Sequence, residues 1–146
     1  MFIVHGHAEE QLHAAARLIN KLTQREPVIL REQPNGGRTI IEKFESHASE
    51  CAFAIVLLTA DDRGRSAKVQ DEQPRARQNV VFEAGYFAGL LGRGKVVLLH
   101  EPGVGLPSDL DGVLYIELSG GWQTNVGIEM RAAGLDIDLN RLSSGD

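Results

Sequence analysis

Seven consecutive apolar residues, AFAIVLL at 52–58, constrain the fold of this chain more than any other segment. A strand with one face in water alternates apolar and polar residues, whereas an unbroken apolar run is typical of a strand buried on both faces. Shorter runs of the same kind occur at 2–5, 27–30, 95–99 and 113–116. Segments with helical spacing of apolar residues lie between most of them. This alternation predicts an α/β fold with right-handed crossovers: a five-stranded parallel sheet of flavodoxin-like order with helices on both faces.

Size and composition bound the class of protein. The chain has 146 residues, enough for one domain with a real core, and its net charge of −5 comes without the basic run that would indicate nucleic-acid binding. A single cysteine, Cys51, excludes an intrachain disulfide and fits a reducing compartment. No apolar run approaches the roughly 20 residues of a membrane span, and no signal peptide is visible. We therefore expect a cytoplasmic protein with one domain at 1–138. The polar tail at 139–146 is expected to fray or to link to an absent sensor domain.

The segment 75–93 predicts an amphipathic helix that carries an acid on its inner side. Glu83 lies four residues before Phe87, and residues three or four apart share a helix face. A carboxylate on that face is costly unless it has a partner or a function. From the helix alone, two interpretations stay open. Either Glu83 has a structural role, as a solvated edge residue or in an ion pair with Arg77 or Arg93, or it is a functional carboxylate.

Open parallel sheets bind ligands beyond the carboxyl ends of their strands, and this rule selects candidate residues. His5 and Gly6 follow the first apolar run, Asp61 follows the third, and the start of the 75–93 helix brings Asn79 and Glu83 toward the same edge. The acidic residues after the third run could instead bind Mg²⁺. No third ligand stands at a zinc spacing from the His-Gly-His segment, so no metal site is predicted.

A basic segment precedes this helix. Residues 63–77 show no hydrophobic period and are expected to form a long exposed loop, a kind that is usually functional or mobile in compact domains. Its cations are Arg63, Arg65, Lys68, Arg75 and Arg77. Such residues usually form a solvated face, and attraction to a diphosphate is the alternative.

Five blocks in order resemble the TIR-like domain of bacterial antiphage effectors, a group that includes TIR domains fused to bacterial STING and those of cyclic-nucleotide-activated defence systems. The blocks are FIVHGH, REQPNGGRTIIEKF, IVLLTADD, RARQNVVFEAGYF and LPSDLDGVLYIEL. Together they cover roughly residues 2–138. The resemblance implies a flavodoxin-like TIR fold and hydrolysis of NAD⁺, as substrate and without a cofactor, to nicotinamide and an ADP-ribose product. It also implies activity in an oligomer and a sensor domain for a cyclic nucleotide as partner.

The resemblance also assigns roles to residues. The family's catalytic glutamate falls on Glu83, and the loop from Gln33 to Arg38 corresponds to the mobile loop that packs on a neighbouring protomer. His5, Gly6, Asn79 and Asp109 are the substrate contacts expected next, followed by Asp61. Many TIR NAD⁺ hydrolases carry Trp-Cys just ahead of the glutamate, whereas this chain has Asn79-Val80.

The chemistry of NAD⁺ explains why one carboxylate is enough. Ordinary glycosidases use two carboxyl groups, of which one protonates the leaving group. Nicotinamide leaves NAD⁺ as a neutral molecule, so no acid is required, and Glu83 alone can stabilise the oxocarbenium-like ribose. Burial beside Phe82, Tyr86 and Phe87 is expected to strengthen this effect. Two other functions remain: a non-catalytic TIR interaction module, and a nucleoside-processing enzyme of similar topology such as a deoxyribosyltransferase.

Overall fold

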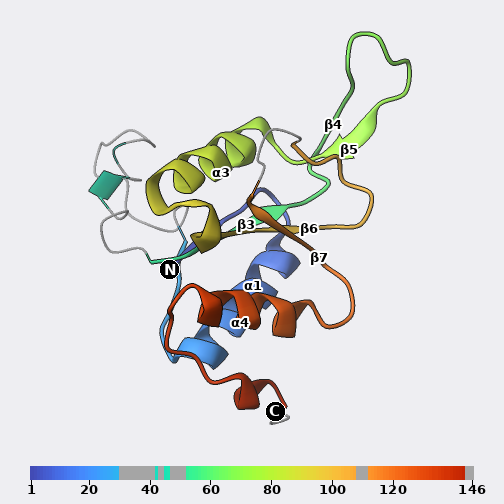
Figure 1. Cartoon of the computed structure of the whole chain (residues 1–146). Coiled ribbons are helices and arrows are strands. Elements are labelled where there is room, and N and C mark those ends of the chain that lie inside the picture. Colours follow the sequence, from blue (N-terminus) through green and yellow to red (C-terminus); the bar gives the residue numbers. More distant parts are fainter. Residues whose placement is uncertain (30–41, 43–44, 47–51, 108–111, 144–146) are drawn as a thin grey trace.

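The computed structural model of the chain describes residues 1–29, 42, 45–46, 52–107 and 112–143 (Figure 1). Its main sheet has five parallel strands in the order β2-β1-β3-β6-β7. The strands are β1 (Phe2–Val4), β2 (Val28–Ile29), β3 (Ala54–Leu58), β6 (Val96–His100) and β7 (Leu114–Glu117). The predicted five-stranded sheet of flavodoxin-like order is therefore confirmed, with the 52–58 run supplying its central strand.

Helices cover both faces of this sheet, as predicted. In Figure 1, α3 lies above the sheet, and α1 and α4 lie side by side below it. Their bounds are α1 (Glu9–Thr23), α3 (Gln78–Leu91) and α4 (Trp122–Ala132), and two 3-10 turns follow at η2 (Arg93–Lys95) and η3 (Leu139–Leu142). Among the described helices, none is long and apolar enough to cross a membrane.

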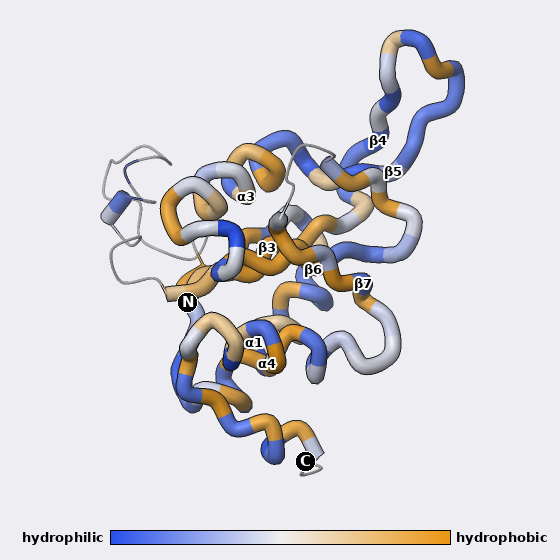
Figure 2. Tube along the Cα trace, viewed as in Figure 1, coloured by the Kyte–Doolittle hydropathy of each residue, from blue (hydrophilic) through white to orange (hydrophobic). Residues whose placement is uncertain are grey.

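The strands divide their side chains between two cores. Successive residues of a strand point to opposite faces, so Val56 and Leu58 pack with α3 while Ile55 and Leu57 pack with α1 and α4. Every residue of β3 is at most 1% exposed. The central strands are accordingly the most continuously hydrophobic part of the trace in Figure 2. Burial on both faces fixes the register, because a slip by one residue would move each side chain into the wrong core.

The segment 63–77 differs from the predicted loop. Strands β4 (Asp62–Gly64) and β5 (Gln73–Arg75) pair antiparallel as a hairpin that projects from the body of the molecule (Figure 1). Figure 2 shows it to be mostly hydrophilic. Because neither face of the hairpin packs on a core, its strands carry no apolar alternation, and the sequence pattern missed them.

Helix α3 begins later than predicted and ends where expected. Gln73–Arg75 belongs to β5, so the helix starts at Gln78 rather than at residue 75. It ends at Gly92, whose φ of +88° is a conformation that L side chains rarely adopt. The predicted inner face is confirmed, since Val80, Ala84 and Phe87 are buried.

The beginning of the C-terminal tail packs on the body instead of fraying. Leu139 and Leu142, in η3, lie against the core formed by α1, α4 and the lower face of the sheet. The backbone N–H of Asp138 donates to the carbonyl of Leu22 over 3.4 Å. The Gln33–Arg38 loop lies outside the described residues, as do Cys51 and Asp109.

Close packing of η3 depends on a glycine in α4. A Cβ at Gly127 would lie 2.5 Å from Leu139 Cδ2 and 3.3 Å from Leu22 Cδ1. We expect Gly127→Val to lower the free energy of unfolding by about 1 to 3 kcal/mol, because the new methyls overpack this contact. The measurement is urea denaturation.

The matched control is Gly89→Ala, in a helix position where an added Cβ meets nothing within 4 Å. It should raise the free energy of unfolding by up to about 1 kcal/mol through helix propensity alone. Equal stabilisation by both substitutions would show that Leu139 does not pack on Gly127 in solution.

Candidate functional site

The carboxyl ends of β1 and β3 and the start of α3 meet at one edge of the sheet, called here the C-terminal edge. Gly6, directly after β1, is buried there. A Cβ at Gly6 would overlap the carboxylate of Asp61 and lie 3.6 Å from Cδ of Arg77. The site therefore requires a residue without a side chain at position 6. This contact brings together three segments of the chain, because Asp61 and Arg77 lie 55 and 71 residues after Gly6 in the sequence.

Asp61 is held in place by the strand that precedes it. The hydroxyl of Thr59, which is only 1% exposed, donates to Oδ2 of Asp61 over 2.6 Å, and the backbone N–H of Asp61 donates to the Thr59 carbonyl over 2.8 Å. The neighbouring N–H of Ala60 donates to Oε1 of Glu101 over 2.9 Å, which ties the segment after β3 to the segment after β6. The carboxylate of Asp61 is thus fixed before any ligand arrives.

Glu83 is half-buried on α3, as the helical spacing predicted. Burial raises the pKa of its carboxyl from the ordinary 4.5 to about 7, and the positive charge of Arg77 partly opposes this rise. Of the two partners left open by the sequence, the electrostatic contact is with Arg77. Arg93 instead lies at the far end of the helix, where its Cδ would be 3.0 Å from a Cβ at Gly112. Glu83 therefore stands near the midpoint of its titration at neutral pH.

The aromatic residues around Glu83 take different positions. Phe87 is fully buried and contacts the ring of Phe2 in a tilted arrangement, with 4.9 Å between ring centroids, and Tyr86 meets Phe87 edge-on at 5.5 Å. Phe82 was expected in the same apolar surroundings, but it is 56% exposed. Its side chain points away from the core because residue 82 is out of phase with the buried face of α3.

The remaining predicted contacts are distributed unevenly. His5 is half-buried at the end of β1, with its Nδ1 2.8 Å from the carbonyl oxygen of Gly6, and Asn79 is exposed in the first turn of α3. The structure thus places Gly6 beside Asp61 and Arg77, and the charge of Arg77 acts on Glu83. It does not test the substrate roles of these residues. Asp109 lies outside the described residues.

Sequence reasoning missed two members of this arrangement. The sequence indicates Arg77 as a charge partner of Glu83 but not as a neighbour of Gly6, and Thr59 was not predicted as a site residue. The signal for Thr59 was its spacing from Asp61, because a hydroxyl two residues before a carboxylate at a strand end can fix that carboxylate locally. Arg77 had no such signal, because its contact with Gly6 joins distant segments.

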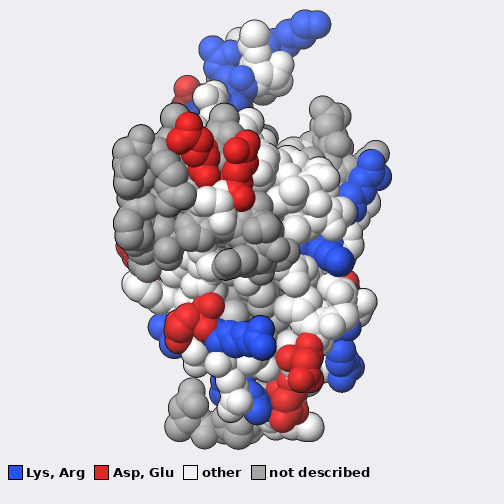
Figure 3. Space-filling view, turned by 90° about the vertical axis from the view of Figure 1, so that its left-hand side faces the viewer, with Lys and Arg blue, Asp and Glu red and all other residues white. Residues whose placement is uncertain are grey.

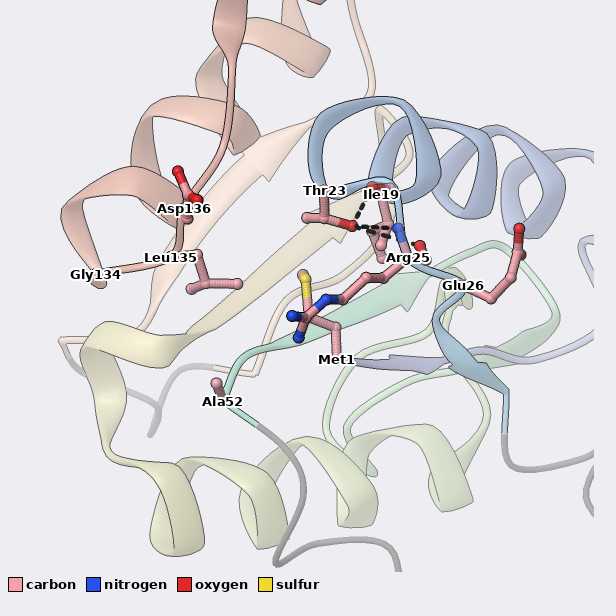
Figure 4. A pocket seen from close by; sticks show the side chains of 9 residues that line it. All are labelled: Met1, Ile19, Thr23, Arg25, Glu26, Ala52, Gly134, Leu135 and Asp136. Carbon is pink, nitrogen blue, oxygen red and sulfur yellow. Dashed lines mark hydrogen bonds between the residues drawn. The ribbon is translucent and has the colours of Figure 1, made fainter.

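A cleft of about 350 Å³ lies at the opposite edge of the sheet (Figure 4). It is lined by Met1, which precedes β1, and by Ala52, which precedes β3, so it opens at the amino ends of the strands. Figure 4 shows the guanidinium of Arg25 directed toward Met1, while the Thr23 hydroxyl donates to the Ile19 carbonyl over 2.7 Å. Ligands of open parallel sheets bind at the other edge, so we do not assign the site here.

The part of the chain that the structure describes contains no group of three His, Cys, Asp or Glu side chains placed to hold a metal ion. The prediction that no metal is needed stays a prediction. Among the described residues, the acidic side chains at the C-terminal edge are Asp61, Glu83 and Glu101, and Arg77 supplies a guanidinium. They suit a ligand that carries hydroxyl groups and a positive charge.

Comparison with known proteins identifies relatives across most of the chain. Residues 1–120 match the family described as the TIR domain of CAP12/Pycsar effector proteins. The chain is 48% identical over 146 residues to the protein YuaY of Escherichia coli, covering 99% of this chain and 48% of YuaY. It is 39% identical over 126 residues to the protein tirC of Dictyostelium discoideum, covering 80% of this chain and 62% of tirC.

A third relative carries an informative name. The Pycsar effector protein PaPycTIR of Pseudomonas aeruginosa is 42% identical over 79 residues, which cover 52% of this chain and 25% of that protein. The chain thus matches about half of YuaY, somewhat more of tirC, and a quarter of the Pycsar effector.

The raised pKa of Glu83 predicts a pH-dependent effect on stability. Below the unfolded pKa of 4.5 the carboxyl is neutral in both states. As the pH rises from 4.5 to about 7, the carboxyl ionises in the unfolded state but stays mostly protonated in the folded state. The free energy of unfolding therefore falls until the pH passes the folded pKa of about 7. We expect Glu83→Gln to raise the free energy of unfolding by about 1 to 2 kcal/mol near pH 8, after allowance for solvent screening. Near pH 4 the same substitution should leave the free energy of unfolding unchanged. Denaturation at both pH values measures it, and an equal effect at both would contradict the burial of a titrating carboxyl.

Proposed function

We propose that this chain, which belongs to the TIR-domain family of the CAP12/Pycsar effectors, hydrolyses NAD⁺ to nicotinamide and an ADP-ribose product. Membership of the family rests on the match over residues 1–120. The observation that carries the enzymatic proposal is the half-buried carboxyl of Glu83 at the C-terminal edge, whose pKa stands near 7. A module that only bound other proteins would have no need of an acid in that position.

The proposed reaction needs little proton transfer. The bond between C1′ of the ribose and the pyridinium nitrogen breaks, and its electron pair neutralises the nicotinamide that leaves. The oxygen of a water molecule then bonds to C1′, and the proton of that water passes to the ionised Glu83 or to solvent. Positive charge develops on the ribose in the transition state, so a carboxylate fixed beside it lowers the barrier. Desolvation of that carboxylate strengthens the interaction.

The other residues of the C-terminal edge support this assignment with distinct roles. Asp61, already oriented by Thr59, can accept hydrogen bonds from ribose hydroxyls. Gly6 lets the carboxylate of Asp61 lie directly against the backbone, because a side chain at position 6 would collide with it, and we propose that the backbone there contacts the substrate. His5 and the exposed Asn79 complete the contacts that we propose. Arg77 keeps the pKa of Glu83 from rising further, so a useful fraction is ionised at neutral pH.

The names of the relatives suggest the biological setting. We propose that the chain acts in bacterial antiphage defence, in the cytoplasm, under the control of a cyclic nucleotide sensed by another domain or partner. Hydrolysis would then require clustering, with the Gln33–Arg38 loop of one copy meeting the next. Activity per molecule should accordingly be assayed over a wide range of protein concentration.

A non-catalytic interaction module is the second candidate, because one observation favours it. Phe82 and Leu90, on the outer side of α3, are 56% and 49% exposed, and exposed apolar side chains on a helix are common at interfaces between proteins. The two candidates differ in what Glu83 does, so the same variant distinguishes them.

We expect Glu83→Gln to reduce nicotinamide release from NAD⁺ by at least about 100-fold, because the neutral amide cannot stabilise the developing positive charge. Glu10→Gln, an exposed carboxylate on α1, is the matched control and should leave the rate unchanged. Chromatography of the products measures both. Release at the wild-type rate by the Glu83 variant would eliminate the enzymatic role. No release by the wild-type chain at any concentration would favour the interaction module.

The rate should also depend on pH through the same carboxyl. If the ionised form is the active one, kcat/KM falls as the pH drops below about 7 and levels off above it. Arg77 lowers the pKa of Glu83, so Arg77→Gln should move this midpoint to higher pH. Arg93→Gln, at the far end of α3, is the control and should leave the midpoint in place. A midpoint that stays fixed in the Arg77 variant would contradict the assignment of the titration to Glu83.

A further inference from the structure

A second cleft lies at the base of the hairpin and has no role in the reaction described above. It has a volume of about 330 Å³, near the lower end of the roughly 300–1,000 Å³ typical of small-molecule sites. Its walls come from the hairpin, the first turns of α3 and the segment after β6. Residues that define it are Gly64, Arg65, Arg75, Val81, Leu106 and Pro107. We call it the hairpin-base cleft.

One arginine is seated in this cleft by a glycine across the hairpin. A Cβ at Gly64 would overlap the guanidinium of Arg75, so the planar group lies directly over the backbone of the opposite strand. Gly64 does not have a positive φ, and its conformation is open to any residue. The glycine is therefore needed for the close approach of Arg75 and not for the backbone. The hairpin thus leaves room for this guanidinium against the opposite strand.

The walls of the cleft are fixed by hydrogen bonds. The N–H of Gly105 donates to the carbonyl of Pro74 over 2.9 Å, and the Tyr115 hydroxyl donates to the carbonyl of Pro107 over 2.6 Å. These bonds fasten the hairpin to the segment after β6, and that segment to β7. The cleft is thus formed by the fold itself, and no rearrangement is needed to open it.

The lining combines flat apolar surfaces with positive charge. Val81 and Leu106 are 37% and 41% exposed, and Pro74 and Pro107 add further apolar surface. Arg65 and Arg75 supply the charge, and among the described residues no salt bridge joins either of them to an acid. Figure 3 shows Lys and Arg side chains gathered at the projecting end of the molecule. Arginine binds phosphate through paired hydrogen bonds and stacks on aromatic rings, so this lining suits a phosphorylated nucleoside.

The hairpin-base cleft and Glu83 both border the first turns of α3. Ala76 lines the cleft and directly precedes Arg77, while Val81 lines it two residues before Glu83, about 3 Å along the helix axis. The cleft and Glu83 flank the first turns of α3 on different sides. This turn carries no acidic residue and no side-chain cap among the described contacts, so the positive end of the helix dipole favours a negatively charged group nearby.

From these observations we infer that the hairpin-base cleft binds the adenosine diphosphate half of NAD⁺, with Arg75 on the phosphates, while the nicotinamide riboside half reaches Glu83. This inference rests on the proposed function. From the sequence alone, attraction to a diphosphate was one of two interpretations of the basic segment 63–77. The inference adopts that interpretation for the hairpin. It also makes Arg75 a residue that selects dinucleotides over shorter nicotinamide compounds.

The test compares two substrates and two variants of the whole chain. Arg75→Ala removes the guanidinium from the cleft, and Lys68→Ala removes the same charge from an exposed position of the hairpin that does not line it. We expect the Arg75 variant to raise the KM for NAD⁺ about tenfold or more and to leave hydrolysis of nicotinamide mononucleotide, which lacks the adenylate, within about twofold. The Lys68 variant should change neither by more than about twofold.

A binding measurement separates this inference from the proposed function. ADP is titrated into the wild-type chain, Arg75→Ala and Lys68→Ala at fixed ionic strength, and binding is measured by calorimetry. This measurement does not depend on hydrolysis of NAD⁺. We expect at least tenfold weaker binding for the Arg75 variant only. Gly64→Val, which keeps the arginine but displaces its guanidinium, should weaken ADP binding as well.

Each outcome is decisive. ADP binding that depends on Arg75, in a chain that releases no nicotinamide, would support the cleft and overturn the enzymatic proposal. NAD⁺ hydrolysis and ADP binding that are the same in the Arg75 and Lys68 variants would overturn the inference and leave the enzyme intact. Loss of oligomers in the Arg75 variant with unchanged ADP binding would also overturn it, because the cleft would then dock a second copy.

Discussion

Burial of β3 on both faces is the constraint on which the rest of the structure depends. Its five side chains alternate between two cores, one under α3 and one over α1 and α4, and they exclude water from both. Pairing with β1 and β6 then sets where the neighbouring strands end. All residues of β3 are apolar and buried, so polar residues follow directly after this strand. Thr59, Asp61 and Gly6 meet for this reason at one edge of the sheet.

At that edge, two opposing influences set the pKa of the Glu83 carboxyl. Burial favours the neutral form of Glu83, and Arg77 favours the ionised form. These two opposing influences together hold the pKa of this carboxyl at about 7. A positively charged sugar would shift the balance toward the ionised form, since it adds a second cation to the first. The side chain would then be most strongly charged when the substrate is in place.

The sequence predicted those parts of the fold that leave a hydrophobic period. The apolar runs gave the five strands of the main sheet, and the face of α3 placed Glu83 at the margin of the core. The hairpin and the packing of Leu139 leave no such period, because β4 and β5 stand away from the body and η3 contributes single leucines within a polar segment. Arg77 could not be assigned to the site because it meets Gly6 through tertiary packing. The relation between Thr59 and Asp61 was local and could have been predicted from their spacing.

The connection between the hairpin and α3 has a mechanical consequence. Strand β5 ends at Arg75 and α3 begins at Gln78, so only Ala76 and Arg77 join them. Ala76 is buried and therefore gives little freedom to swivel. The hairpin is also tied to the segment after β6, because the N–H of Gly105 donates to the carbonyl of Pro74 over 2.9 Å. Its base is therefore held at two places, and it cannot tilt as a rigid body without straining the short link that contains Arg77, the cation beside Glu83.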